Sequence, residues 1–152
     1  MKAEVRGECS ASAKKIWDTC FLDLRTWSKW DPDIVEVQTK EGDHFCSEGA
    51  TCEFIMKEPK DKRHTVTLTN VIRNRELTFG GSLILGMVTF KGHIILSEDE
   101  IPGKTSIHYS FGLTGLVGGI MGRIMSKPIQ EGCEKGLANI CSLAEDKGIL
   151  HE

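Results

Sequence analysis

The stretch Trp27-Ser28-Lys29-Trp30-Asp31-Pro32 stands where a helical pattern ends and a strand pattern begins. Its two tryptophans are three residues apart, which places both on one face of a short helical turn. Pro32 disfavours continuation of that helix, because its ring restricts the preceding residue to extended backbone. We therefore expect this turn to close the preceding helix against a sheet.

Helical spacing precedes the tryptophan turn. Between Ala13 and Leu24 apolar residues recur at intervals of three and four, which predicts an amphipathic helix of about three turns. Ser10 and Ser12 are both suitable N-caps for it. Further upstream, Lys2–Cys9 alternates charged and small residues, so we expect a short strand with one solvated face.

After Pro32 the hydrophobic pattern has a period of two, which indicates strands. The Gly80-Gly81 pair predicts a break or bulge, and the connections are of hairpin length, so the pattern indicates an antiparallel meander. Together with the first strand this gives six or seven strands. The expected segments are Ile34–Thr39, Ala50–Lys57, His64–Arg73, Glu76–Phe79, Leu83–Ser97 and Thr105–Leu113.

The helical period returns from Leu116 to Gly148. At about 100° per residue, the apolar stripe rotates by roughly half a turn across Pro128. Because proline kinks or splits a helix, we expect two helical pieces or one bent helix. The fold class is α+β. With neither repeats nor linkers, we expect one domain over residues 1–152.

Composition narrows the function classes. The 152 residues include 19 Lys plus Arg and 22 Asp plus Glu, for a net charge of −3, which argues against a nucleic-acid partner. No apolar stretch approaches the roughly 20 residues that cross a bilayer, and the charged start is not typical of a signal peptide. These features predict a cytoplasmic protein without a transmembrane segment, in which all six cysteines are reduced.

Motifs for metals and cofactors are missing from the sequence. His44, Cys46 and Cys52 lack a second matching pair, so we expect no metal site. The glycines at 118, 119 and 122 lack the spacing of a dinucleotide fingerprint, so we expect no cofactor.

Tyr109 is the one candidate catalytic residue. A phenol in an apolar cavity can hydrogen-bond a ligand carbonyl or stabilise an enolate, although a buried tyrosine more commonly bonds a backbone group. The five histidines fall at turns, at the terminus or on the solvent side of strands, so we expect none of them to be catalytic. Asp31 and Asp33 are expected to shape the turn.

The sequence resembles the START-like (SRPBCC) superfamily, in its polyketide cyclase/dehydrase-type branch. The matching features are Ile16-Trp17-Asp18, the Trp27-x-x-Trp30-Asp31-Pro32 motif, Glu76-Leu77-Thr78-Phe79 and the run from Phe111 to Val117. The resemblance implies a helix-grip fold, with a curved antiparallel sheet wrapped around the C-terminal helix. It also implies a deep cavity for an apolar small molecule, and it leaves the reaction open.

The residue pattern leads to a similar expectation. One helix cannot completely cover the concave side of a curved sheet, so we expect an apolar pocket with few polar anchors. The alternative is that the same side chains interdigitate in a close-packed core. The expected ligand-binding residues are Phe54, Met56, Leu68, Phe90, Ile94, Tyr109 and Phe111 from the strands, and Met121, Ile124, Met125, Ile129 and Cys133 from the final helix.

The leading hypothesis is the binding or transport of a small hydrophobic ligand, such as a lipid, isoprenoid, sterol-like or polyketide-like molecule. The first alternative is a cyclase or aromatase-type enzyme that acts on such a ligand, and the second is a protein-interaction module. The oligomeric state is not defined by the sequence. Residues 113–125 carry one charge, Arg123, and glycines gather at 112, 115, 118, 119 and 122. This segment is expected to be a lid that touches membranes transiently or, alternatively, a buried helix start.

Overall fold

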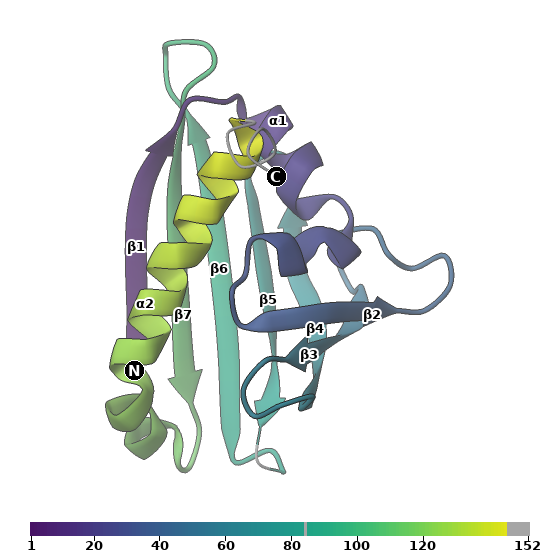
Figure 1. The fold of residues 1–152 in the computed structure, drawn as a ribbon, viewed down its shortest axis with the longest axis vertical. Helices are drawn as coiled ribbons and strands as arrows, with labels where there is room; N and C mark the ends of the chain where they lie inside the picture. The colour runs from purple at the N-terminus through teal and green to yellow at the C-terminus, as the bar shows by residue number, and fades with distance from the viewer. Residues whose placement is uncertain (84, 146–152) are drawn as a thin grey trace.

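The computed structural model describes residues 1–83 and 85–145. Its elements follow one another in the order shown in Figure 1. They are β1 (Lys2–Cys9), α1 (Ala13–Ile16), the π-helical turn η1 (Trp17–Phe21), the 3₁₀ helix η2 (Leu24–Lys29), β2 (Ile34–Thr39), β3 (Thr51–Met56), β4 (Arg63–Ile72), β5 (Glu76–Leu83), β6 (Val88–Glu98), β7 (Thr105–Thr114) and α2 (Gly118–Ala144).

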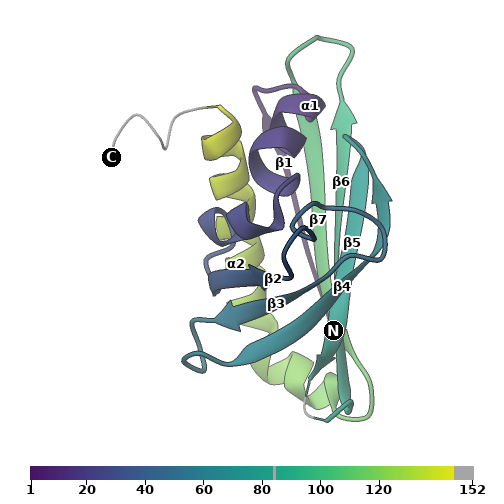
Figure 2. The same cartoon turned by 90° about the vertical axis from the view of Figure 1, so that its right-hand side faces the viewer.

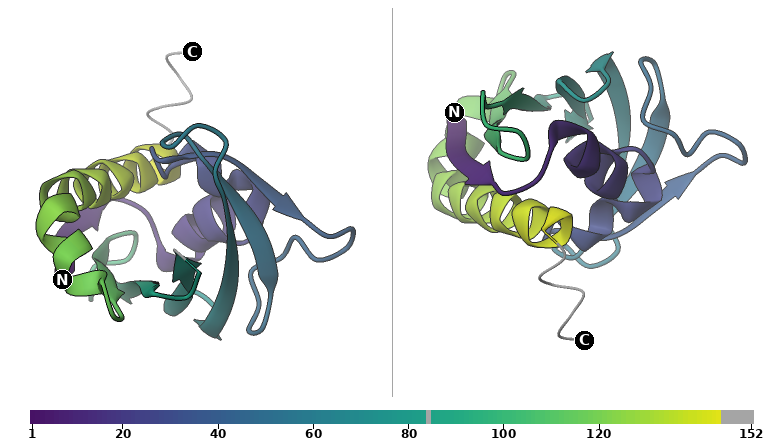
Figure 3. Two further views of the ribbon diagram at one scale, coloured as in Figure 1. Left: turned by 90° about the horizontal axis from the view of Figure 1, so that it is seen from below. Right: turned by 90° about the horizontal axis from the view of Figure 1, so that it is seen from above.

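Within the described residues, the seven strands form one antiparallel sheet in the order β1-β7-β6-β5-β4-β3-β2. The sheet is curved and unclosed, and α2 runs along its concave side, where it packs on β1 and β7 (Figures 1 and 2). Seen from below, α2 lies along one flank of the curved sheet and β2 and β3 along the other (Figure 3). This arrangement confirms the predicted α+β helix-grip fold.

The first helical segment differs in detail from the single three-turn helix that the spacing predicts. Ser12 is the N-cap, since its hydroxyl accepts a hydrogen bond of 3.1 Å from the Lys15 backbone N–H. The helix then widens into a π turn, in which the Leu22 N–H donates to the Trp17 carbonyl at 2.8 Å. The wider turn places Trp17, Cys20 and Phe21 all on the buried side.

The tryptophan turn forms as predicted. Trp27 lies within η2 and Trp30 follows its last residue, and both indoles are fully buried. Ring contacts join the two indoles to each other and to Phe21. The turn thus fixes the helical segment to the core, against β2.

Gly80 and Gly81 do not end their strand, so the predicted break is wrong. A Cβ atom at Gly80 would lie 2.7 Å from the Phe90 carbonyl oxygen, and one at Gly81 would lie 2.3 Å from the Thr65 carbonyl oxygen. The glycines therefore permit close approach of neighbouring backbone while β5 continues past them. The following strand begins at Val88, later than the sequence predicts.

The C-terminal segment is one helix with Pro128 inside it, not two separate pieces. Figure 2 shows that its first turns point in a different direction from the rest. The proline removes a backbone donor and its ring crowds the preceding turn, which accounts for the bend.

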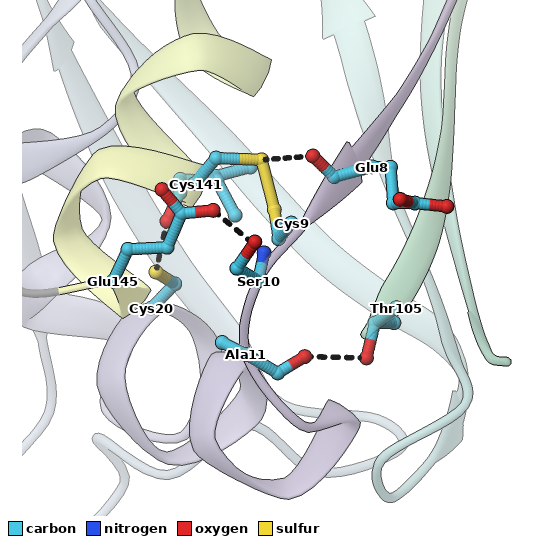
Figure 4. The surroundings of a disulfide bond; sticks show 9 residues. Glu8, Cys9, Ser10, Ala11, Cys20, Thr105, Cys141 and Glu145 are labelled. Carbon is cyan, nitrogen blue, oxygen red and sulfur yellow. Dashed lines mark hydrogen bonds between the residues drawn. A yellow bond between two sulfur atoms is a disulfide. The ribbon is translucent and has the colours of Figure 1, made fainter. Parts of the chain in front are cut away.

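The prediction that all six cysteines are reduced is wrong for Cys9 and Cys141, which form a disulfide (Figure 4). Their Cα atoms are 5.1 Å apart although 132 residues separate them in the sequence. Cys9 ends β1, and α2 crosses that strand with Cys141 near its own last turn. Beside the disulfide, the Ser10 N–H donates to the Glu145 carboxylate at 2.6 Å. The other four cysteines are buried free thiols.

Candidate ligand-binding site

Tyr109 lies on the inner face of the sheet, on the strand next to the β1 edge. It is a β7 residue whose register neighbours are Val5 on β1 and Ile94 on β6. Its ring is buried and meets the Trp30 indole edge to face, with the ring centres 6.1 Å apart. A Cβ atom at Gly136 of α2 would lie 3.6 Å from both rings, so this small residue lets the helix come close to the pair.

Three weak acids gather around this position. The Tyr109 hydroxyl and the Cys133 thiol lie close enough to interact, and the Asp31 carboxylate lies near enough to affect both electrostatically. Burial raises the pKa of Asp31 to about 6, helped by the nearby charge of Asp33, although the Asp33 backbone N–H stabilises the carboxylate with a hydrogen bond of 2.9 Å.

The phenol and the thiol are both neutral at physiological pH. Burial is the main reason that the pKa of Tyr109 lies well above its ordinary value, and the Asp31 charge adds to the effect. Burial also raises the pKa of Cys133 to about 12. The cluster therefore contains two neutral hydrogen-bonding groups and one carboxyl that titrates near neutrality, which is a suitable set of polar anchors in an apolar surrounding.

Hydrogen bonds to backbone carbonyls hold the two tryptophans in place. The indole N–H of Trp30 donates to the Cys20 carbonyl at 3.0 Å, and that of Trp27 donates to the Phe21 carbonyl at 3.1 Å. The Asn139 side chain on α2 donates to the Trp30 carbonyl at 3.0 Å. Because their polar atoms are satisfied locally, the two indoles present only apolar surface to the interior.

A continuous row of aromatic rings leads away from this polar cluster. Successive ring centres are 6.1, 5.5, 5.4, 6.5 and 6.1 Å apart. The row runs in the order Tyr109, Trp30, Trp27, Phe79, Phe111 and Phe90. Gly92 makes room for it, because a Cβ atom there would lie 2.1 Å from the Phe79 ring.

The rings of the row are not equally well covered. Phe111 is only partly buried, although it points to the concave side of the sheet. Other apolar side chains that are only partly buried against the core are Met56, Leu83, Val117, Met121 and Ile129. We call Phe111 with these five residues the mouth.

Two hollows in the described part of the chain lie outside the space between the sheet and α2. One, of about 460 Å³, lies on the outer face of the sheet beside Arg6, Glu8 and His108. The other, of about 520 Å³, lies between β1 and the outer side of α2, beside Lys127 and Gln130. The buried apolar side chains between the sheet and α2 belong to one core cluster, and the deep cavity stays a prediction.

The predicted ligand-binding residues fall into three groups. Phe54, Leu68, Phe90, Ile94, Tyr109 and Cys133 are buried in the core, whereas Met56, Phe111, Met121 and Ile129 belong to the mouth. Ile124 and Met125 are exposed on α2 and do not face the sheet. Their role in ligand binding stays a prediction for all twelve.

Sequence reasoning missed the second role of Asp31. The expected turn is present, since its carboxylate accepts the Asp33 N–H, but the same carboxyl also lies beside Tyr109 and Cys133. The available signal is that Asp31 directly follows the fully buried Trp30, so its backbone starts beside the core. Residues 1–83 and 85–145 contain no group of three metal-ligating side chains, and no helix among them is long and apolar enough to cross a membrane.

A strand-helix-sheet-helix chain of this topology, with an aromatic interior beneath the last helix, is a helix-grip protein. The sequence model of the family described as Polyketide cyclase / dehydrase and lipid transport matches residues 1–145. The chain belongs to this family. No curated protein matched the sequence.

Solved structures share the fold at low sequence identity. The protein XoxI from Bacillus cereus is 16% identical, with 99% of each chain covered and a TM-score of 0.71. A hypothetical protein from Helicobacter pylori, jhp0584, is 8% identical over 95% of this chain and 88% of its own, with a TM-score of 0.77. The di-domain ARO/CYC BexL of the BE-7585A biosynthetic pathway is 14% identical, with a TM-score of 0.68, over 95% of this chain and 46% of its own.

Proposed function

We propose that the protein binds or carries a small hydrophobic ligand, such as a lipid, isoprenoid, sterol-like or polyketide-like molecule, between the sheet and α2. The observation that carries this proposal is the row of rings from the mouth to the buried Tyr109 cluster. Apolar walls with a few polar groups at the inner end are the usual composition of a ligand site. The family description, which includes lipid transport, supports the same function.

The ligand reaches the row by displacing side chains at the mouth. Entry between the first turns of α2 and β7 requires these two elements, which pack on each other, to move apart. Gly115, with φ of +108°, precedes these turns and provides backbone freedom there. The proposal includes a transient contact of this end with a lipid surface while the cargo is exchanged. In this proposal the whole chain acts as one binding domain.

The cellular location is not part of the proposal. The sequence predicts a cytoplasmic protein, but a disulfide such as Cys9–Cys141 is typical of oxidising compartments. The cytoplasmic location therefore stays a prediction.

Ligand titration tests the binding function. A naphthylamine probe that fluoresces in apolar surroundings is expected to bind with one-to-one stoichiometry and to change the emission of the buried tryptophans. Met121→Trp, which fills the mouth, is expected to abolish binding, whereas Ile101→Trp, an exposed site in the turn between β6 and β7, is the matched control. Absence of binding to the probe and to a panel of fatty acids, isoprenoids, sterols and polycyclic aromatics would refute the proposal.

A cyclase or aromatase activity is the second candidate, favoured by the position of Asp31 beside Tyr109. The carboxylate is suited to remove a proton next to a ligand carbonyl, while the phenol donates a hydrogen bond to the resulting enolate oxygen. If the protein is such an enzyme, Tyr109→Phe and Asp31→Asn each lower turnover of a polyketide-like substrate and leave its affinity nearly unchanged. Turnover that both variants retain would exclude this mechanism.

A further inference from the structure

One end of the molecule carries an unusual concentration of exposed apolar side chains. They come from the β5–β6 hairpin, the β7–α2 connection and the first turns of α2. These segments meet, since the Val117 N–H donates to the Met87 carbonyl at 3.4 Å. Both connections lie at the lower end of the molecule in Figures 1 and 2. The apolar tip consists of Leu85, Met87, Leu116, Ile120, Ile124 and Met125.

The hairpin in this tip is unfavourable for a protein end that faces only water. Leu85 and Gly86 have φ angles of +54° and +85°, a left-handed turn in which asparagine followed by glycine is the usual choice. A leucine at the first position raises the energy of the turn, and its side chain is fully exposed. Leu116 in the adjacent connection is 86% exposed. Such a combination of backbone strain and apolar exposure indicates a function for the exposed side chains.

The charged residues in the chain segments that form the tip are all basic. Residues 85–91 and 113–128 contain Lys91, Arg123 and Lys127 and no acidic residue, in a chain whose net charge is −3. At 100° per residue, Arg123 and Lys127 share the exposed face of α2 with Ile120 and Ile124. Within the described residues no acidic side chain pairs with any of the three cations, and the first acid farther along this helix face is Glu131.

We propose that the apolar tip docks on a lipid bilayer with anionic headgroups, with Leu85 and Leu116 inserted among the acyl chains and Arg123 and Lys127 at the headgroup level. An apolar face rimmed by cations suits the boundary between acyl chains and anionic headgroups. A second copy of the chain fits less well, because it would bring its own arginine and lysine against those of the first.

Docking would also place the mouth against the lipid. Met121 and Val117 of the mouth belong to the same segment as Leu116 and Ile120 of the tip. The inference rests on the proposed function in this respect, because a hydrophobic ligand could then pass between the bilayer and the ring row without crossing water.

Vesicle co-sedimentation tests the inference, with vesicles of phosphatidylcholine alone and of phosphatidylcholine mixed with phosphatidylserine. The wild type is expected to bind the mixed vesicles and to release them at high salt. Arg123→Gln/Lys127→Gln is expected to weaken binding about 30-fold, since each cation near an anionic surface contributes about 1 kcal/mol. Lys40→Gln/Lys60→Gln, which removes the same charge from exposed sites elsewhere, is the control.

The apolar part of the tip has its own pair of variants. Leu85→Ser/Leu116→Ser is expected to reduce binding to mixed vesicles at least tenfold, whereas Ile101→Ser, at the opposite end of the molecule, is expected to leave it unchanged. Thermal melting of each variant confirms that it is folded.

The naphthylamine titration, done without vesicles, separates the two proposals. Loss of vesicle binding in the tip variants with unchanged probe binding supports docking. Probe binding by a wild type that ignores mixed vesicles overturns docking and leaves the proposed function intact. Equal binding to both kinds of vesicle overturns the headgroup assignment, and a doubled mass that Leu85→Ser/Leu116→Ser returns to that of one chain assigns the tip to self-association.

Discussion

The Cys9–Cys141 disulfide should stabilise the protein far more than any single core contact. It closes a loop of 132 residues, which includes nearly the whole sheet. In the chain-entropy description, a loop of this length lowers the entropy of the unfolded chain by an amount that corresponds to about 5 kcal/mol at 25 °C. Reduction, or the double substitution Cys9→Ser/Cys141→Ser, is expected to remove most of this stabilisation.

Urea denaturation with and without a reducing agent measures the effect. A loss of about 5 kcal/mol corresponds to a midpoint lower by about 2.5 M, at roughly 2 kcal/mol per M. The double variant should have the midpoint of the reduced wild type and should not respond to the reductant. Because Cys20, Cys46, Cys52 and Cys133 are free, the unfolded wild type should show four reactive thiols before reduction.

Two results would refute this reasoning. Six reactive thiols in the unfolded, unreduced protein would show that the disulfide does not form. Identical midpoints for the oxidised and reduced protein would show that packing of α2 on β1 and β7 already restricts the chain as much as the covalent link does.

Three other predictions concern the core and the first helix. Asp31→Asn keeps a side-chain oxygen that accepts the Asp33 N–H. The pKa of Asp31 in the folded protein is raised to about 6. The contribution of the protonated carboxyl to wild-type stability is therefore complete below about pH 4 and is lost as the pH rises through 6. The variant is therefore expected to match the wild type in unfolding free energy at pH 4 and to exceed it by up to about 3 kcal/mol at pH 7, and a difference that is independent of pH would contradict the burial of this carboxyl. Gly92→Ala is expected to lower the unfolding free energy by about 1–3 kcal/mol through its clash with Phe79, and Phe79→Leu in the same chain should recover part of the loss in urea melts. Ser12→Ala should lower the unfolding free energy by about 1 kcal/mol whereas Ser10→Ala should not, and equal effects would count against the assigned N-cap.

Local patterns were sufficient to predict the architecture. The period-two segments after Pro32 give the strands because each has one buried and one solvated face, and β2 begins and ends where the sequence predicts. The tryptophan turn is equally local, since spacing and a proline define it. The strand break predicted at Gly80 and Gly81 was wrong, because a glycine pair is compatible both with a break and with the close approach of a neighbouring backbone. Only the positions of Phe90 and Thr65 distinguish the two.

The candidate site was less accessible to sequence reasoning because its members meet only through tertiary packing. Tyr109 could be named as the single phenol on an apolar strand face, and Cys133 as part of the helix stripe. Their meeting with Asp31 depends on how far α2 is shifted along the sheet, which no local pattern records. The Cys9–Cys141 disulfide was hidden for the same reason.

The pairing of β1 with β7 has a consequence for how the chain is made. Lys2 pairs with Gly112 and Cys9 with Thr105, so β1 has no partner in the sheet until β7, the last strand of the sheet, has been synthesised. The hairpins from β2 to β6 can assemble as they are synthesised, whereas the edge of β1 and the Trp30 indole, which contacts Tyr109, stay unprotected until β7 and α2 emerge. Long-range pairing of this kind slows folding and prolongs exposure to aggregation. Final closure of the sheet therefore waits for β7, and β1 is the strand that needs protection for longest.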